Sequence, residues 1–255
     1  MPASYAHQRF GAQVLKTMPA EQRQCVQRFR RMFDAGLHGP DIFFYYNPFW
    51  KNAVCDLARD FHRQTGQEFF RAACKAASSE AARAYLYGLL AHYCLDSLCH
   101  PLVNQLDSIG EAKHTLLESE FDRYLLALDG EQDPAHFDAG KRLRLTRGEC
   151  MTAAEFYPGV EGGQVNRSVK AMAFFIRYLA TGNVQRKKAF LDKLKPGLTD
   201  HMIPAEENEE FALYVRELKD RYDEAAERYP FLLEAITAHM DSGRDLGGLF
   251  EPNFG

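Results

Sequence analysis

The 255-residue sequence lacks the features that would assign it to several common protein classes. It contains no run of about 18 uncharged apolar residues, since the best candidate, from Ala84 to Leu95, ends at Asp96, and no bilayer-spanning helix is predicted. It contains no GxSxG, P-loop or GxGxxG motif, so serine-hydrolase, NTPase and dinucleotide chemistry have no support. Its net charge of −4 argues against a protein that coats a polyphosphate.

Two further absences concern the cellular compartment. No CxxC pair occurs among the six cysteines, and the first eleven residues, MPASYAHQRFG, show no basic segment followed by an apolar stretch. We therefore expect a cytoplasmic protein whose cysteines are buried thiols in a reducing environment. The cysteines are Cys25, Cys55, Cys74, Cys94, Cys99 and Cys150.

The sequence has the composition of a globular protein, with 46% hydrophobic and 26% charged residues, and its hydrophobic period is helical nearly throughout. The only strand-like alternation is KRLRLTR at 141–147, and the aromatic, Gly- and Pro-containing stretch 36–50 is predicted to be a loop. The pattern predicts one all-α domain over residues 1–255. Its expected helices cover residues 4–17, 19–36, 51–64, 67–77, 79–100 with Pro101 just beyond the end, 110–128, 166–181, 184–194, 205–228 and 230–241.

Histidines and carboxylates at helical spacing carry the chemistry. His92, Asp96 and His100 follow one another at four-residue intervals and form a row about 12 Å long on one helix, so the helix could present His92 and Asp96 to one metal ion and His100 to another. His114 and Glu118 repeat the spacing on the next predicted helix. Imidazole and carboxylate ligands suit zinc, and also iron or manganese. A coincidental histidine cluster is the alternative.

These residues also carry a resemblance to a known family. AHYCLDSLCHP followed by HTLLESEFD resembles the core motif of the zinc-dependent phospholipase C family, which shares its fold with the S1/P1 nucleases. Upstream, SYAHQRFG, HGPDIFFY and LARDFH resemble the family's N-terminal histidine segment, its Pro-Asp loop and its next histidine helix. The resemblance spans about residues 1–125 in the expected order.

The resemblance implies two to three zinc ions and a set of ligands for each ion. A first ion would be bound by Asp41, His62, His92 and Asp96, and a second by His100, His114 and Glu118. His7 and the other side of Asp96 would contribute to a third, and Asp41 would act as metal ligand or general base. Asp122, four residues beyond Glu118, is a candidate to orient a ligand.

The sequence departs from the secreted members of this family at two points. Those enzymes bind the third ion through the amine and carbonyl of an N-terminal tryptophan, whereas Trp50 is the only tryptophan here. The interval from Asp96 to His100 is also shorter than in the secreted enzymes. It keeps one continuous helix, and it resembles a cytoplasmic branch of the family.

Three functions are compatible with the sequence. The first is a metal-dependent phosphodiester hydrolase of the phospholipase C type, acting on a small-molecule or lipid phosphodiester. The second is a nuclease of the same fold, which the acidic charge disfavours, and the third is a non-catalytic metal-binding protein. The aromatic run 43–50 could wall a substrate pocket or pack on the core, and KRLRLTR could meet a phosphate or form a solvated loop. The oligomeric state is left open.

Overall fold

The computed structural model describes residues 4–194 and 197–255, and within these ranges the chain forms helices and no strand. The fold class predicted from the sequence is therefore correct. The α-helices are α1 (Ser4–Thr17), α2 (Ala20–Arg28), α3 (Arg30–Gly36), α4 (Ala53–Arg63), α5 (Gly66–Ala76), α6 (Glu80–Ser108), α7 (His114–Leu128), α8 (Arg147–Ala154), α9 (Gly162–Ala180), α10 (Val184–Leu194) and α11 (Ala212–Ser242). Short 3-10 helices are η1 (Gly39–Tyr45), η2 (Pro134–His136), η3 (Ala139–Arg142), η4 (Leu198–His201), η5 (Glu209–Phe211) and η6 (Gly248–Phe250).

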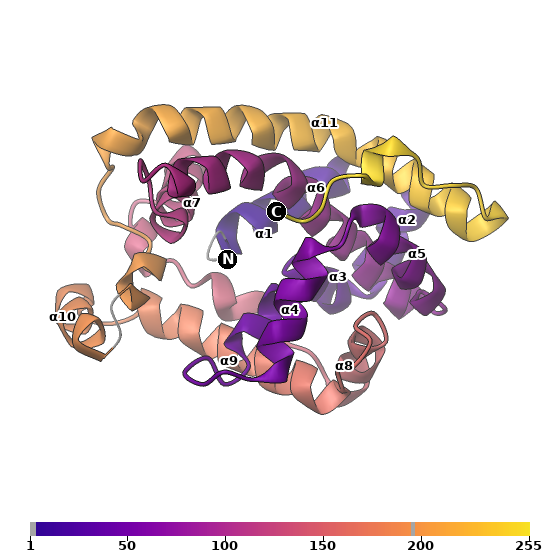
Figure 1. The fold of residues 1–255 in the computed structure, drawn as a ribbon, viewed down its shortest axis with the longest axis horizontal. Helices are drawn as coiled ribbons and strands as arrows, with labels where there is room; N and C mark the ends of the chain where they lie inside the picture. Colours follow the sequence, from indigo (N-terminus) through magenta and orange to yellow (C-terminus); the bar gives the residue numbers. More distant parts are fainter. Residues whose placement is uncertain (1–3, 195–196) are drawn as a thin grey trace.

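Helix α6 is the centre of the molecule, and α1, α3, α7 and α11 pack around it (Figure 1). The contact with α3 is unusually close because both helices present glycine where they cross. A Cβ atom on Gly36 would lie 2.3 Å from the carbonyl oxygen of Tyr85, and one on Gly88 would lie 2.2 Å from that of Phe33. This approach brings the chain after α3, which contains the HGPD segment, against the face of α6 that carries His92.

Two predicted helix ends are wrong, because prolines lie inside long helices. Helix α6 continues through Pro101 to Ser108, and α11 passes through Pro230, joining the stretches predicted as 205–228 and 230–241. The predicted start at residue 205 is also wrong, because η5 precedes α11, which begins at Ala212. An interior proline removes one backbone hydrogen bond and usually costs about 3 kcal/mol. Here the residues beyond each proline are buried, including Val103 in α6 and Ile236 in α11, and their packing offsets that cost.

Other local predictions also need correction. The stretch 141–147 is not a strand, since it ends η3 and leads into α8, whose N-terminus is capped by Thr146 and Glu149. The predicted helix 19–36 breaks at Phe29 into α2 and α3, and the predicted loop 36–50 contains η1. Helix α7 begins at His114 rather than at residue 110, where Gly110 has a positive φ of 77°. Helix α9 begins at Gly162, four residues before the predicted start.

The cysteine prediction holds in part. All six thiols are free, and Cys55, Cys94 and Cys150 are buried, but the other three are only half-buried. No helix in the described part of the chain has the length and apolar character needed to cross a membrane.

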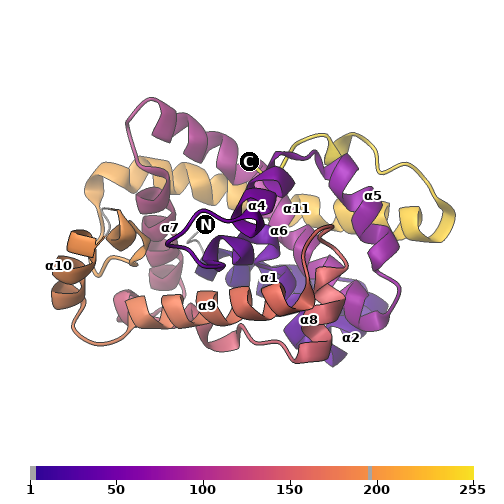
Figure 2. The same cartoon turned by 60° about the horizontal axis from the view of Figure 1, so that its bottom comes forward.

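The elements that carry the predicted ligands converge although they are distant in sequence. Helix α1, η1, α4, α6 and α7 surround a common interior region, with α9 closing the side below it (Figures 1 and 2). After α11 the chain turns back, and its last residues run between α4 and α6 to end near the centre of the view in Figure 1. This segment is held by the amide of Gly66, which donates to Pro252 O at 2.8 Å, and by the amide of Phe254, which donates to His62 O at 3.2 Å.

Candidate metal centre

Seven of the eight predicted ligands fall into two compact groups. The first contains His7, Asp41, His92 and Asp96, and the second contains His100, His114 and Glu118; within each group the potential ligand atoms all lie within 4.8 Å of one another. His62 lies beside the first group and contacts one of its members. Every one of these side chains is buried except His114, which is half-buried.

The first group is built around two carboxylates. His92 Nε2 lies 3.2 Å from Asp96 Oδ2 and 3.9 Å from Asp41 Oδ1. His62 Nε2 lies 2.8 Å from the same Asp41 oxygen. His7 Nε2 lies 3.2 Å from Asp96 Oδ1, and its ring stacks on His92 with the ring centroids 4.6 Å apart. Four separate elements, α1, η1, α4 and α6, thus direct imidazole and carboxylate groups at one point.

The second group lies between the C-terminal half of α6 and the start of α7. His100 Nε2 is 3.4 Å and His114 Nε2 is 3.2 Å from the same oxygen, Oε1 of Glu118. The two imidazole rings are 5.2 Å apart. Two histidines around one carboxylate oxygen form a three-ligand set with room for a further ligand, as in catalytic zinc sites.

Asp96 joins the two groups. Its oxygens lie 3.2 Å from His7 Nε2 and from His92 Nε2 in the first group, and 3.6 Å from His100 Nδ1 in the second. Oδ1 faces His7, whereas Oδ2 faces His92 and His100, so the two oxygens point at different histidines and could bind two cations.

Backbone carbonyls determine which nitrogen each histidine offers. His62, His92 and His100 each direct Nδ1 at a carbonyl oxygen: that of Ala58 at 2.7 Å, Leu37 at 3.2 Å and Phe254 at 2.8 Å. A carbonyl can only accept a hydrogen bond, so Nδ1 carries the proton and the lone pair of the neutral ring is on Nε2. Nε2 then faces Asp41 in His62, Asp96 in His92 and Glu118 in His100, which is the arrangement typical of metal-binding histidines.

The protonation states reflect both burial and the neighbouring charges. Burial lowers the pKa of His92 to about 4, so its imidazole is neutral and can act as a ligand. Burial opposes protonation of His100 as well, but the charges of Asp96 and Glu118 raise the pKa of His100 to about 9. Against burial, which favours the neutral acid, the histidines hold the pKa of Asp41, Asp96 and Glu118 below the ordinary range. The centre therefore contains buried ionised carboxylates, whose charge a bound cation would compensate.

Three buried polar atoms test whether the residues fit a metal. His92 Nε2, Asp96 Oδ2 and His7 Nδ1 have no hydrogen-bond partner among the described residues, although each is shielded from solvent. Leaving such atoms unsatisfied costs about 1–3 kcal/mol each, and more for a charged group. A cation coordinated by His92 and Asp96 would satisfy two of them. The mixture of nitrogen and oxygen donors fits zinc.

The HGPD segment forms the wall opposite α6. Gly39 has φ of 47°, and a Cβ atom there would lie 2.5 Å from His92 Cδ2, so only glycine allows the loop to approach the imidazole. Pro40 lies in the first turn of η1, directly before Asp41, which belongs to the first group. His38 was not among the predicted site residues, yet it is buried, and burial lowers its pKa to about 3. The sequence signal that could have identified His38 is its position in the HGPD motif, three residues before Asp41.

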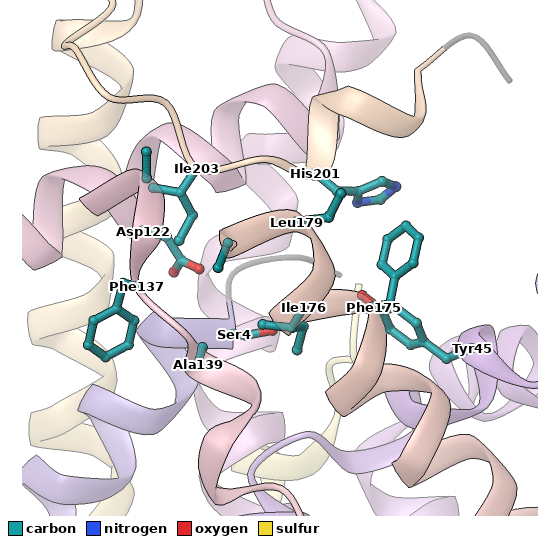
Figure 3. Close-up of a pocket in the computed structure, with 12 residues that line it drawn as sticks. Ser4, Tyr45, Asp122, Phe137, Ala139, Phe175, Ile176, Leu179, His201 and Ile203 are labelled. Carbon is teal, nitrogen blue, oxygen red and sulfur yellow. The ribbon is translucent and has the colours of Figure 1, made fainter. Parts of the chain in front are cut away.

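Asp122 has a positioning role that the sequence indicated only by its spacing. Its carboxylate accepts the amides of Ala6 at 2.8 Å and Tyr5 at 3.0 Å, which are at the N-terminus of α1. It therefore holds the helix that carries His7. Burial raises the pKa of Asp122 to about 7. Figure 3 shows this side chain near Ser4 on the wall of a cavity of about 40 Å³.

The two motifs with alternative interpretations, KRLRLTR and the aromatic run 43–50, differ in how far they are buried. In KRLRLTR, Leu143 is buried and the four basic side chains are exposed, as in a solvated loop. In the aromatic run, Phe43 and Tyr45 are buried, and Phe43 packs edge-on against Tyr157 with the ring centroids 4.8 Å apart. Phe49 and Trp50, at the end of the same run, are exposed. The first part of the run therefore packs on the core, and the last part does not.

The fold and the centre together define a helical protein with buried histidine and carboxylate groups of the kind that bind metal ions. Residues 6–164, more than half of the chain, match the family model for zinc-dependent phospholipase C, and the chain belongs to this family. The matched range includes all eight predicted ligands, from His7 near its start to Glu118 well within it. No curated protein and no solved structure shows a significant match to the chain.

Proposed function

We propose that this protein is a zinc-dependent phosphodiester hydrolase that cleaves phospholipid-type substrates at a centre of two or three metal ions. The observation that carries the proposal is the position of Asp96 between two buried ligand groups. Membership of the family supports a phospholipase C-like hydrolase with a lipid phosphodiester substrate. The expectation of a cytoplasmic location stays a prediction.

The proposed ligands divide between the ions as follows. His92, Asp41 and Asp96 hold the first ion, and His100, His114 and Glu118 hold the second. His62 either binds the first ion beside Asp41 or orients that carboxylate, to which it lies at 2.8 Å. His7, which belongs to the first group, contributes with Asp96 to a third ion.

The chemistry that these residues support is phosphodiester hydrolysis. When bound, zinc ions would supply positive charge for the phosphate oxygens and lower the pKa of a water molecule. Asp41 is ionised, since the histidines around it lower its pKa, and it can accept a proton from the attacking water. Asp96 keeps the two ligand groups at a fixed separation, and the carbonyl partners of His62, His92 and His100 keep the imidazoles from rotating.

A test of metal content comes first. We expect at least two zinc ions per chain by elemental analysis, and His100→Ala should lose one ion while keeping most of the other. His136→Ala is the matched control, because His136 is an exposed histidine paired with Asp133. Wild-type protein with less than one metal equivalent after reconstitution with zinc would overturn the proposal.

The activity test separates the three candidate functions. Zinc-loaded protein is assayed on a bis-aryl phosphodiester, short-chain phosphatidylcholine and single-stranded DNA. Cleavage of the lipid but not the DNA supports the proposed function, and cleavage of DNA alone indicates a nuclease. If none of these nor a wider panel of phosphodiesters is cleaved, the protein is a metal-binding protein without this activity.

A further inference from the structure

A cavity of about 450 Å³ opens beside the second ligand group. His114 of the second ligand group and its neighbour Thr115 line this cavity, and so do the aromatic side chains of Phe44, Tyr45 and Phe175. Figure 3 shows Phe175 between Tyr45 and His201, both of which also line this cavity. Among the described residues that line it there is no aspartate or glutamate, whereas Lys51 and Arg59 are both present.

Two large aromatic side chains stand in solvent at the mouth of this cavity. Phe49 is 59% and Trp50 is 72% exposed, and their rings lie edge to face with centroids 6.1 Å apart. Phe43 and Tyr45, from the same aromatic run, are buried. The outer pair is thus not used for packing within the chain, and adjacent exposed aromatics of this size are typical of an interaction surface.

The loop that carries the pair is braced at its base. Asn47 adopts a positive φ of 48°, and the amide of Trp50 donates to Asn47 O at 3.1 Å. The side-chain amide of Asn52 donates to the carbonyls of Tyr46 and Trp50, both at 2.9 Å. These bonds close the turn and hold its tip away from the body of the protein, so the exposure of the aromatics is built into the backbone.

Positive charge accompanies the aromatics. Lys51 is exposed and has no ion pair among the described residues, and Arg59 is paired only with exposed Asp56, a contact of little strength in water. Helix α10 packs against η4, which contributes His201 to the cavity, and it adds exposed Arg186, Lys188 and Lys193. In Figures 1 and 2 the loop points toward the end of the molecule that carries α10.

We propose that Phe49, Trp50, Lys51 and Arg59, called here the aromatic rim, dock the protein on the surface of an anionic phospholipid bilayer. Tryptophan prefers the boundary between headgroups and acyl chains, and Lys and Arg are attracted to anionic headgroups. In this orientation the cavity opens onto the membrane, with the second ligand group behind it. The choice of a lipid surface rather than a protein partner rests on the proposed function.

The chain contains one tryptophan, Trp50, so its fluorescence reports on the rim alone. Zinc-loaded protein is mixed with vesicles of equal parts phosphatidylglycerol and phosphatidylcholine, or of phosphatidylcholine only. We expect a blue shift of the emission with the anionic vesicles, weakened by added salt because exposed charges are screened. No blue shift, or an equal response to both vesicles at low and high salt, overturns the proposal.

Variants then locate the surface by vesicle sedimentation. Phe49→Ala with Trp50→Ala, and separately Lys51→Glu, should each reduce partitioning onto anionic vesicles by roughly 10-fold or more. Phe231→Ala is the matched control, because Phe231 is 61% exposed on α11 and does not line this cavity, and it should bind like the wild type. Rim variants that bind as well as the control overturn the proposal.

The two proposals fail in different ways. Docking is measured without turnover, and hydrolysis is measured on a water-soluble bis-aryl phosphodiester. Vesicle binding without hydrolysis of any phosphodiester removes the proposed function and leaves the docking surface in place. Hydrolysis of the soluble substrate without vesicle binding removes the docking surface and leaves the proposed hydrolase activity in place.

Discussion

The histidines of the metal centre differ in protonation although they lie close together. His92 is shielded from water and donates its Nδ1 proton to Leu37 O, and burial lowers its pKa to about 4. His100 is equally buried but lies between Asp96 and Glu118, whose charges raise its pKa to about 9. In the metal-free chain, protonated His100 therefore carries positive charge that partly compensates Asp96 and Glu118. A bound zinc ion would supply that positive charge instead.

This difference predicts a pH dependence for the metal-free protein. The pKa of His100 is raised from 6.5 to about 9, so the stabilisation from its proton is complete below about pH 6.5 and disappears as the pH rises through about 9. Over this window the free energy of unfolding of chelator-treated protein should fall by up to about 3 kcal/mol. Urea denaturation at several pH values measures it. His100→Gln should flatten the dependence, and an equally steep fall in that variant would contradict the assignment.

A substitution at Asp96 tests the bridging carboxylate. Asp96→Asn keeps the size of the side chain but removes the charge that both ligand groups face. Substitution of residues that merely orient metal ligands lowers activity or metal affinity by about 10–100-fold. Because Asp96 is a proposed ligand itself, we expect its substitution to lower phosphodiesterase turnover by more than about 100-fold. Circular dichroism should show the helical fold retained. Asp241→Asn, at an exposed carboxylate on α11, serves as the control and should keep full turnover.

At the scale of elements, the centre depends on how closely α3 approaches α6. The two glycines at the crossing, Gly36 and Gly88, allow backbone contact between the helices. The residue that follows α3, Leu37, supplies the carbonyl that orients His92. Packing between two helices and the geometry of a ligand are therefore coupled through one backbone group.

Gly88→Ala tests this coupling. The added Cβ would lie 2.2 Å from Phe33 O and 3.0 Å from Leu37 N, and backbone atoms cannot move aside as a flexible side chain can. We expect a loss of about 1–3 kcal/mol in the free energy of unfolding, together with weaker zinc binding. Gly163→Ala in α9 is the control, since its Cβ would meet nothing within 4 Å, and it should be neutral or slightly stabilising. Equal stability of the two variants would contradict the close crossing.

At the scale of the whole molecule, the candidate metal centre unites segments from both ends of the described chain. His7 comes from α1, the ligands of α6 and α7 from the middle, and the carbonyl of Phe254 from the segment after α11. The ionised Asp41, Asp96 and Glu118 are buried in this interior, and the loss of their hydration opposes folding unless cations compensate their charge.

Chelation should therefore lower the melting temperature of the whole protein reversibly. A ligand present at 1,000 times its dissociation constant stabilises the native state by about 4 kcal/mol, which corresponds to about 10 °C for a protein of this size. Thermal unfolding is followed by circular dichroism before chelation, after verified metal removal and after zinc is restored. An unchanged melting curve after removal would show that the histidine cluster does not depend on metal for stability.

The sequence by itself determined what depends on local spacing. The helical period predicted an all-α fold, and the four-residue intervals at His92, Asp96 and His100 placed two of these residues in contact and separated the third. Separately, the resemblance carried by the histidine- and carboxylate-bearing motifs and their order predicted the family, which the match over residues 6–164 confirms. The helical fold and the grouping of these side chains follow from backbone geometry over a few turns, which neighbouring residues alone specify.

Only the tertiary structure decided what depends on contacts between distant segments. Helices α6 and α11 continue through Pro101 and Pro230 because burial beyond each proline offsets the lost hydrogen bond. The carbonyl of Phe254 orients His100 across 154 residues, and no periodicity predicts a partner at that separation. The exposure of Trp50 beside buried Tyr45 likewise arises because a turn at Asn47 directs the end of one aromatic run into solvent while its beginning packs inside.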